Sequence, residues 1–125
     1  MPIVPDNMEI GQYFKAKELK CKCGCNGLVY DLELIQKLDI LREFLGKPVV
    51  VNSGYRCISH NTKVGGSKNS QHMLGTAADI KVTGVSPKQL AAIAERIYEK
   101  PFGGLGIYSW GIHVDTRTKK ERWNE

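Results

Sequence analysis

Three side chains in the second half of the chain could bind one metal ion: His72, Asp79 and His113. His72 and Asp79 lie in the stretch 70–80, which reads SQHMLGTAADI, and His113 lies in the later segment WGIHVDTR. Two imidazoles and one carboxylate leave a fourth position open to water, which is the ligand count of a catalytic zinc site. We therefore expect these residues to bind a zinc ion that carries out hydrolytic chemistry.

The spacing between His72 and Asp79 requires a bend in the chain. Each ligand atom must lie about 2.0–2.2 Å from the metal, whereas seven residues span roughly 23 Å on a strand and roughly 10.5 Å on a helix. Gly75 lies between the two and accepts backbone angles that other residues resist. Taken singly, each residue also has an ordinary interpretation, His72 as a loop histidine and Asp79 as a turn residue.

Three short motifs occur in the order found in one known family. They are Ser-Gly-Tyr-Arg at 53–56, Ser-Gln-His at 70–72 with Asp79 seven residues beyond the histidine, and His-Val-Asp at 113–115. From about Phe14 to Arg117 the sequence resembles the zinc D-Ala-D-Ala carboxypeptidase family, which includes phage endolysins. The resemblance implies an α+β fold of the hedgehog/D-Ala-D-Ala peptidase type, in which a small antiparallel sheet carries the zinc site and two main helices flank it.

The same resemblance implies an activity. It indicates a hydrolase, a zinc metallopeptidase of the carboxypeptidase or endopeptidase type, that degrades the cell wall by cutting peptidoglycan stem peptides, as an endolysin does. Zinc in such a site lowers the pKa of its bound water toward about 7 and polarises the scissile carbonyl. The family motif assigns Arg56 to substrate binding, because a planar guanidinium binds a carboxylate through two parallel hydrogen bonds. Ser70 is the second substrate-binding candidate. The alternatives are a surface position for Arg56 and a turn-capping role for Ser70.

Asp115 is the candidate catalytic residue. Side chains alternate along a strand, so His113, Asp115 and Arg117 share one face, which we expect to be the cleft face. Relatives place a Glu or His base two or three residues before the last ligand, but Gly111 and Trp110 occupy those positions and cannot transfer a proton. Asp115 is therefore predicted either to take the proton from water or to fix the tautomer of a ligand histidine. A purely structural aspartate is the third possibility.

Two other functions compete with a wall peptidase. The first is a non-catalytic, zinc-containing module that binds the cell wall or a phage structural component, as hedgehog domains hold zinc on this fold without hydrolysis. The missing upstream base favours this alternative. The second is a zinc hydrolase that acts on a peptide from outside the wall. Lysis of purified peptidoglycan would separate both alternatives from the wall peptidase.

Length and charge restrict the partners. We expect 125 residues to form one domain, residues 1–125, and to act as a monomer. The net charge of +5 suits an anionic polymer such as a bacterial wall. No basic helix interleaved with aromatic residues is evident, so nucleic acid is not an expected partner. The N-terminus lacks signal-peptide features and no apolar run approaches about twenty residues, which predicts cytoplasmic synthesis without membrane insertion and access to the wall by another route.

The cysteines form a separate group: Cys21, Cys23, Cys25 and Cys57. In a reducing cytoplasm, clustered cysteines more often indicate free thiols or metal than disulfides. The Cys-x-Cys-x-Cys spacing differs from the common Cys-x2-Cys zinc pattern. Three interpretations therefore stay open, namely unpaired thiols, a structural zinc, and a disulfide between Cys57 and one member of the cluster.

Local patterns predict the supporting elements. Apolar residues at helical spacing, with Asp31 as N-cap and Gly46 beyond the end, predict a helix over 32–45. The Ser-Pro-Lys-Gln pattern at 86–89 predicts a capping box and a helix that ends by residue 100. The remaining segments are predicted as a turn of helix within 14–19, strands at 49–51, 78–82, 105–108 and 112–116, a loop over 52–69 that lines the active site, an irregular arm over 1–13 and a solvated tail over 118–125.

Overall fold

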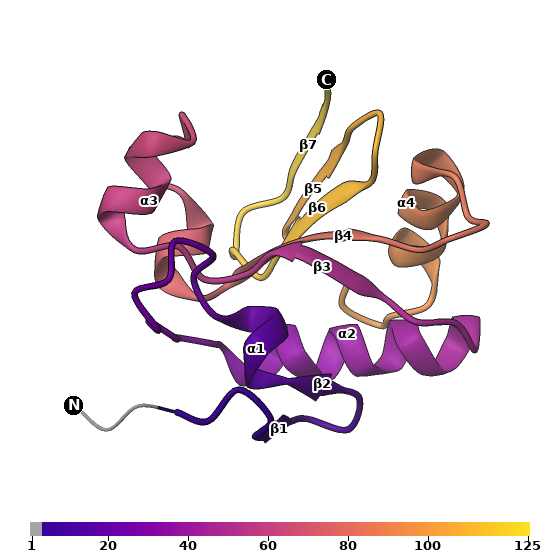
Figure 1. Ribbon diagram of the computed structural model, residues 1–125. Coiled ribbons are helices and arrows are strands. Elements are labelled where there is room, and N and C mark those ends of the chain that lie inside the picture. The colour runs from indigo at the N-terminus through magenta and orange to yellow at the C-terminus, as the bar shows by residue number, and fades with distance from the viewer. Residues whose placement is uncertain (1–3) are drawn as a thin grey trace.

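A five-stranded sheet forms the centre of the fold (Figure 1). The computed structural model describes residues 4–125. The strands are ordered β3-β4-β6-β5-β7, and neighbours run antiparallel except that β7 pairs with β5 in parallel. The architecture is therefore α+β, as the family motifs imply. The strands are β3 (Val50–Ser53), β4 (Ala77–Lys81), β5 (Gly104–Ile107), β6 (Ile112–Asp115) and β7 (Glu121–Asn124).

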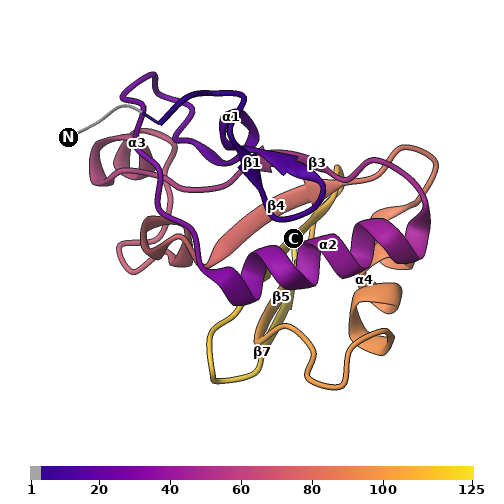
Figure 2. The same cartoon turned by 90° about the horizontal axis from the view of Figure 1, so that it is seen from below.

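Helix α2 (Leu32–Leu45) lies across the sheet in Figure 2 and has the predicted bounds. Asp31 caps its N-terminus by accepting a hydrogen bond from the amide of Leu34, and Gly46 ends it with a φ of 63°. One oxygen of Asp31 also accepts a 2.9 Å hydrogen bond from the hydroxyl of Thr116, just beyond β6. The helix end is thus tied to the centre of the sheet.

Helix α4 (Pro87–Arg96) begins with the predicted capping box between Ser86 and Gln89. It ends earlier than the expected limit near residue 100, because the following residues contact α2 instead. The hydroxyl of Tyr98 donates a hydrogen bond to the carbonyl of Lys37, and the ammonium of Lys37 donates to the carbonyl of Lys100. These contacts between α2 and the segment after α4 take the place of another helical turn.

The remaining elements are short. They are the hairpin of β1 (Glu9–Ile10) with β2 (Phe14–Lys15), α1 (Ala16–Leu19), α3 (Ile58–Lys63) and the 3-10 turn η1 (Gln71–Leu74). The core lies between the sheet and the helices, and its largest side chains with almost no exposure include Leu34, Leu38, Leu41, Ile80, Leu90, Phe102, Ile112 and Val114. No helix within residues 4–125 has the length and apolar character needed to cross a bilayer.

Two predicted irregular segments are more ordered than expected. The predicted loop over 52–69 contains α3, whose first turn follows Cys57. The predicted arm contains the β1 strand, and Ile10 is buried in the core with 1% exposure. Residues 1–3 of that arm lie outside the described residues.

The C-terminal segment is not a solvated tail, since it supplies strand β7. Arg122 forms a two-pronged ion pair with Glu95 of α4, at 2.7 and 2.8 Å, so its charge is compatible with a place in the sheet. The indole of Trp123 packs over Gly106 of β5, where a β-carbon would lie 2.2 Å from the indole nitrogen. The charged composition of this segment therefore concealed a strand.

Candidate metal centre

The three residues predicted as ligands converge on one point. Asp79 of β4 and His113 of β6 are directly opposed in the sheet, and His72 reaches them from η1. Oδ1 of Asp79 lies 3.1 Å from Nε2 of His72 and 3.0 Å from Nδ1 of His113. All three side chains are buried, with exposures of 2–7%. The structure thus brings together potential ligand atoms that all lie within 4.8 Å of one another.

The bend between His72 and Asp79 occurs where the sequence indicated. Residues of η1 make one 3-10 turn, and Gly75 then adopts a φ of 76°. A β-carbon at Gly75 would also lie 2.5 Å from the carbonyl oxygen of Val29. Ser70 caps this turn, since its hydroxyl accepts a hydrogen bond from the amide of His72 at 3.2 Å. The local conformation therefore aims the imidazole of His72 at β4.

A hydrogen bond on its far side fixes each imidazole. Nδ1 of His72 donates to the carbonyl oxygen of Gly54 at 2.7 Å, and Nε2 of His113 donates to Oδ2 of Asp115 at 2.7 Å. In the neutral tautomers that these partners assign, the nitrogens facing Asp79 carry lone pairs. Two lone pairs and a carboxylate oxygen that face one another repel unless a cation, either a metal ion or a proton on one imidazole, lies between them. The donor set therefore fits a metal ion.

The charge of Asp79 is balanced from two sides. Burial raises the pKa of this carboxyl group, but the imidazoles of His113 and His72, which donate hydrogen bonds to it when they are protonated, outweigh burial and hold the pKa well below its ordinary value. Its other oxygen, Oδ2, accepts a hydrogen bond from Nη2 of Arg56 at 3.1 Å. Asp79 is consequently ionised and presents Oδ1 to the imidazoles.

Arg56 lies inside the site and not on the outer surface. Its guanidinium donates to the hydroxyl of Ser53 at 3.0 Å, to the amide oxygen of Asn61 at 3.3 Å and to Asp79. Asn61 is itself buried and donates to the carbonyl oxygen of Ser67 at 2.8 Å. The guanidinium plane is therefore held in a fixed orientation where it lines the cleft.

Asp115 lies behind His113 and does not line the cleft. Its side chain has 0% exposure, and Oδ1 accepts hydrogen bonds from the amides of Gly104 and Arg117. The guanidinium of Arg117 donates to both carboxylate oxygens, with a shortest distance of 2.7 Å. The expectation that Asp115 faces the cleft with His113 is thus wrong for its carboxylate, which folds over Gly104 of β5. A β-carbon at Gly104 would lie 2.2 Å from Oδ2.

This buried group of charges affects both members of the His113–Asp115 pair. Burial raises the pKa of Asp115, but hydrogen bonds from His113 and Arg117 outweigh it and hold the pKa well below its usual range. Burial lowers the pKa of His113, but the hydrogen bonds that the protonated ring donates to Asp115 and Asp79 outweigh burial and raise the pKa above its ordinary value. Asp115 is therefore an anion that orients the imidazole and increases its basicity.

A polar cleft of about 670 Å³ opens over the three potential ligands. The segment 64–71 forms part of its wall, which agrees with the prediction that the long connection lines the site. Sequence reasoning missed three residues of the lining: Tyr108, Trp123 and Glu125. The indole of Trp123 lies 5.1 Å from the ring of His113 and donates to the hydroxyl of Tyr108 at 2.9 Å. In the sequence, the one feature that could have indicated this part of the lining is the single tryptophan, Trp123, within a charged segment.

The fold and this site together define the class of the protein. It is an α+β protein whose buried His-Asp-His centre is formed by two adjacent strands of a largely antiparallel sheet and by the 3-10 turn η1. Residues 12–115 match the model of the peptidase M15 family, and the chain belongs to that family. A segment of 60 residues is 42% identical to the zinc D-Ala-D-Ala carboxypeptidase of Streptomyces albus G. The match covers 47% of this chain and 22% of that relative. The family indicated by the three sequence motifs is thus confirmed.

Proposed function

We propose that this protein is a zinc-dependent peptidase that hydrolyses peptide bonds of peptidoglycan stem peptides, with carboxypeptidase or endopeptidase specificity. One observation carries the proposal: Nε2 of His72, Oδ1 of Asp79 and Nδ1 of His113 converge beneath a polar cleft. Membership of the peptidase M15 family and the name of the Streptomyces relative support the same reaction and substrate class. The role in the cell wall is then that of a wall-degrading enzyme of the endolysin type.

His72, Asp79 and His113 are the proposed zinc ligands. When bound, zinc supplies Lewis acidity, which polarises a carbonyl and makes water acidic enough to attack at neutral pH. The protein holds the ligands in place through groups behind them. Gly54 fixes His72 through its carbonyl and Asp115 fixes His113, so neither imidazole has to reorient when the ion binds.

Arg56 and Ser70 are the proposed substrate-binding residues. Arg56 provides a fixed positive charge beside Asp79, which favours a stem peptide that ends in a carboxylate. The hydroxyl of Ser70 accepts a hydrogen bond from the amide of His72 and keeps its own proton for a substrate carbonyl. The stacked rings of Tyr108 and Trp110, 5.4 Å apart, give the cleft a flat apolar wall against which alanyl methyl groups can pack.

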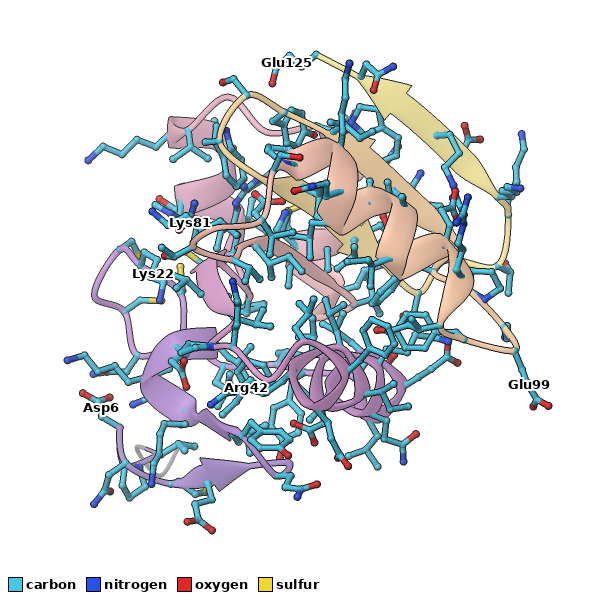
Figure 3. All side chains as sticks on the ribbon, turned by 90° about the vertical axis from the view of Figure 1, so that its right-hand side faces the viewer. Asp6, Lys22, Arg42, Lys81, Glu99 and Glu125 are labelled. Atoms are coloured by element: carbon cyan, nitrogen blue, oxygen red, sulfur yellow. The ribbon has the colours of Figure 1, made fainter. Side chains whose placement is uncertain are left out.

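We propose that Asp115 positions His113 and is not the group that takes a proton from water. Both of its oxygens already accept hydrogen bonds, and its side chain has 0% exposure. Among residues 4–125, Glu125 is the one acidic residue of the cleft lining apart from Asp79. Figure 3 labels Glu125 directly after β7, at the end of the C-terminal segment. We therefore propose Glu125 as the proton acceptor.

Digestion of purified peptidoglycan tests the proposed function. Zinc-loaded protein should release soluble peptide fragments, and mass spectrometry of the products would assign the bond, since a carboxypeptidase releases free D-alanine and an endopeptidase cuts within the stem or cross-bridge. Chelation should abolish the reaction and added zinc should restore it. Protein that binds zinc yet leaves both walls and synthetic stem peptides intact would instead indicate a binding module.

A further inference from the structure

The four cysteines form a second cluster that the proposed reaction does not use. Cys21, Cys23 and Cys25 lie on the loop after α1, and Cys57 follows Arg56 at the start of α3. The fold brings Cys57 to the other three across a sequence separation of 36 residues from Cys21. The four sulfur atoms all lie within 4.8 Å of one another. Lys22, labelled in Figure 3, marks this loop.

The distances between the sulfurs match a shared metal ion. Sγ of Cys21 lies 3.4 Å from Sγ of Cys23 and 3.7 Å from Sγ of Cys57, and the sulfurs of Cys23 and Cys57 are 3.7 Å apart. Four thiolates at about 2.3 Å from a tetrahedral zinc have edges of about 3.8 Å. A disulfide requires about 2.05 Å, and these four cysteines are free.

Backbone amides support negative charge on three of the sulfurs. The amide of Gly27 donates to Cys25 at 3.3 Å, that of Cys57 to Cys21 at 3.4 Å, and that of His60 to Cys57 at 3.4 Å. Hydrogen bonds to a charged acceptor are stronger than those to a neutral thiol, and donors behind metal ligands orient them. These amides are therefore placed as they would be around bound thiolates.

We propose that Cys21, Cys23, Cys25 and Cys57 bind a structural zinc ion, separate from the His-Asp-His centre. Thiolates select soft divalent ions, and a tetrahedral set of four sulfurs selects zinc. Four protein ligands leave no open position, so this ion takes no part in hydrolysis. Binding displaces the thiol protons and stabilises the folded form of the loop. Of the three interpretations that the sequence left open, the geometry favours this one.

The proposed ion would stabilise the segment 54–57, which lies against the His-Asp-His centre. Cys57 directly follows Arg56, which donates to Asp79, and the carbonyl of Gly54 accepts the hydrogen bond that fixes His72. The amide of Arg56 also donates to the carbonyl of His72 at 3.1 Å. The segment 54–57 therefore supports two of the three proposed ligands, and the cysteine site anchors one end of it.

The other side of this anchor is the loop after α1. The amide of Tyr55 donates to the carbonyl of Leu19 at 3.0 Å, and the amide of Cys21 donates to the carbonyl of Gly27 at 2.9 Å. A β-carbon at Gly54 would lie 2.8 Å from the carbonyl oxygen of Leu19. The two segments thus touch through their backbones, and the ion would lock this contact.

Metal content of the purified full chain tests the proposal. The unaltered protein should contain two zinc ions per chain by mass spectrometry of the metal. The double variant Cys21→Ser/Cys57→Ser should lose one of them, and His72→Ala/His113→Ala should keep one. Lys22→Ser changes the same loop without removing a sulfur and should keep both. Cobalt substituted into the histidine variant should give a sulfur-to-cobalt charge-transfer band, which the cysteine variant should lack.

A second measurement needs no variant. An organomercurial that binds thiols should release one equivalent of zinc from the unaltered chain, detected with a coloured zinc indicator. Release of no zinc, or a cysteine variant with the metal content of the unaltered chain, would overturn the proposal. Alkylation of fewer than four cysteines after denaturation with chelator but no reductant would overturn it as well, since it would reveal a disulfide. The histidine variant separates these outcomes from the fate of the hydrolytic centre.

Discussion

Oδ2 of Asp115 lies 2.7 Å from Nε2 of His113, on the opposite side of the imidazole from Asp79. This carboxylate also accepts from the guanidinium of Arg117 and from the amide of Gly104. The pair explains how a buried histidine keeps one tautomer and one orientation. It also makes the proposed roles of Asp115 experimentally separable.

Asp115→Asn should weaken zinc binding at the His-Asp-His centre by roughly 10–100-fold, because the amide is a poorer partner for the imidazole. Turnover should largely recover in excess zinc. Titration of activity against zinc measures both effects. A loss of roughly two or more orders of magnitude in turnover with unchanged zinc affinity would instead assign Asp115 as the general base.

Glu125→Gln should lower turnover by roughly 100-fold or more while zinc content stays at the unaltered level, since the amide cannot accept a proton. The control is Glu121→Gln on β7, the strand that Glu125 directly follows; the carboxylate of Glu121 pairs with Lys119 outside the cleft. Steady-state kinetics on a synthetic stem peptide would compare the two. Full activity in Glu125→Gln would remove this residue from proton transfer.

Arg56→Lys should retain the fold and the metal but lower kcat/KM by about tenfold or more. One ammonium group cannot reproduce the planar contacts to Ser53, Asn61 and Asp79 and also meet a substrate carboxylate. A loss of tenfold corresponds to about 1.4 kcal/mol of transition-state stabilisation. Arg96→Lys, an exposed change on α4, is the matched control. Equal kinetics in both variants would contradict the anchoring role.

Gly75→Ala should destabilise the protein more than Gly65→Ala does. Both glycines have positive φ, at 76° and 72°, so both changes incur backbone strain of about 1–3 kcal/mol. Only at Gly75 would the new β-carbon meet another atom, the carbonyl oxygen of Val29 at 2.5 Å. Denaturant unfolding of the two variants measures the difference. Similar losses would show that the contact with Val29 relaxes freely.

The elements that could be predicted from the sequence are those whose start, buried face and end are determined by residues close together in the chain. Helix α2 was predicted with its bounds because its cap at Asp31, its leucine stripe and its stop at Gly46 are all encoded nearby. Strand β7 was missed because its parallel pairing with β5 is non-local and its arginine is neutralised by Glu95 of a distant helix.

The same distinction applies to the site. The convergence of the proposed ligands was predictable from their residue types and their order in the sequence. The bend at Gly75 was predictable because glycine accepts positive φ angles. The support behind them was not predictable, because the carbonyl of Gly54 is a backbone group placed by tertiary structure. The alternation of side chains along β6 correctly predicted the face of the sheet on which Asp115 lies. It could not predict that the carboxylate is buried, because the space that the carboxylate fills exists only since Gly104 on the neighbouring strand has no side chain.

The carboxylate of Asp31 joins residues 85 positions apart, since it caps α2 and accepts from Thr116 beyond β6. A contact between residues so far apart in sequence forms only after most of the chain has collapsed. The entropy cost of closing the intervening loop makes this contact slow to form. The first turn of the helix and the end of the strand that carries His113 should therefore open together as one cooperative unit. Amide hydrogen exchange at both places should then share one opening free energy. The His-Asp-His centre would therefore be among the last parts to form, and its presence would report on the integrity of the whole fold.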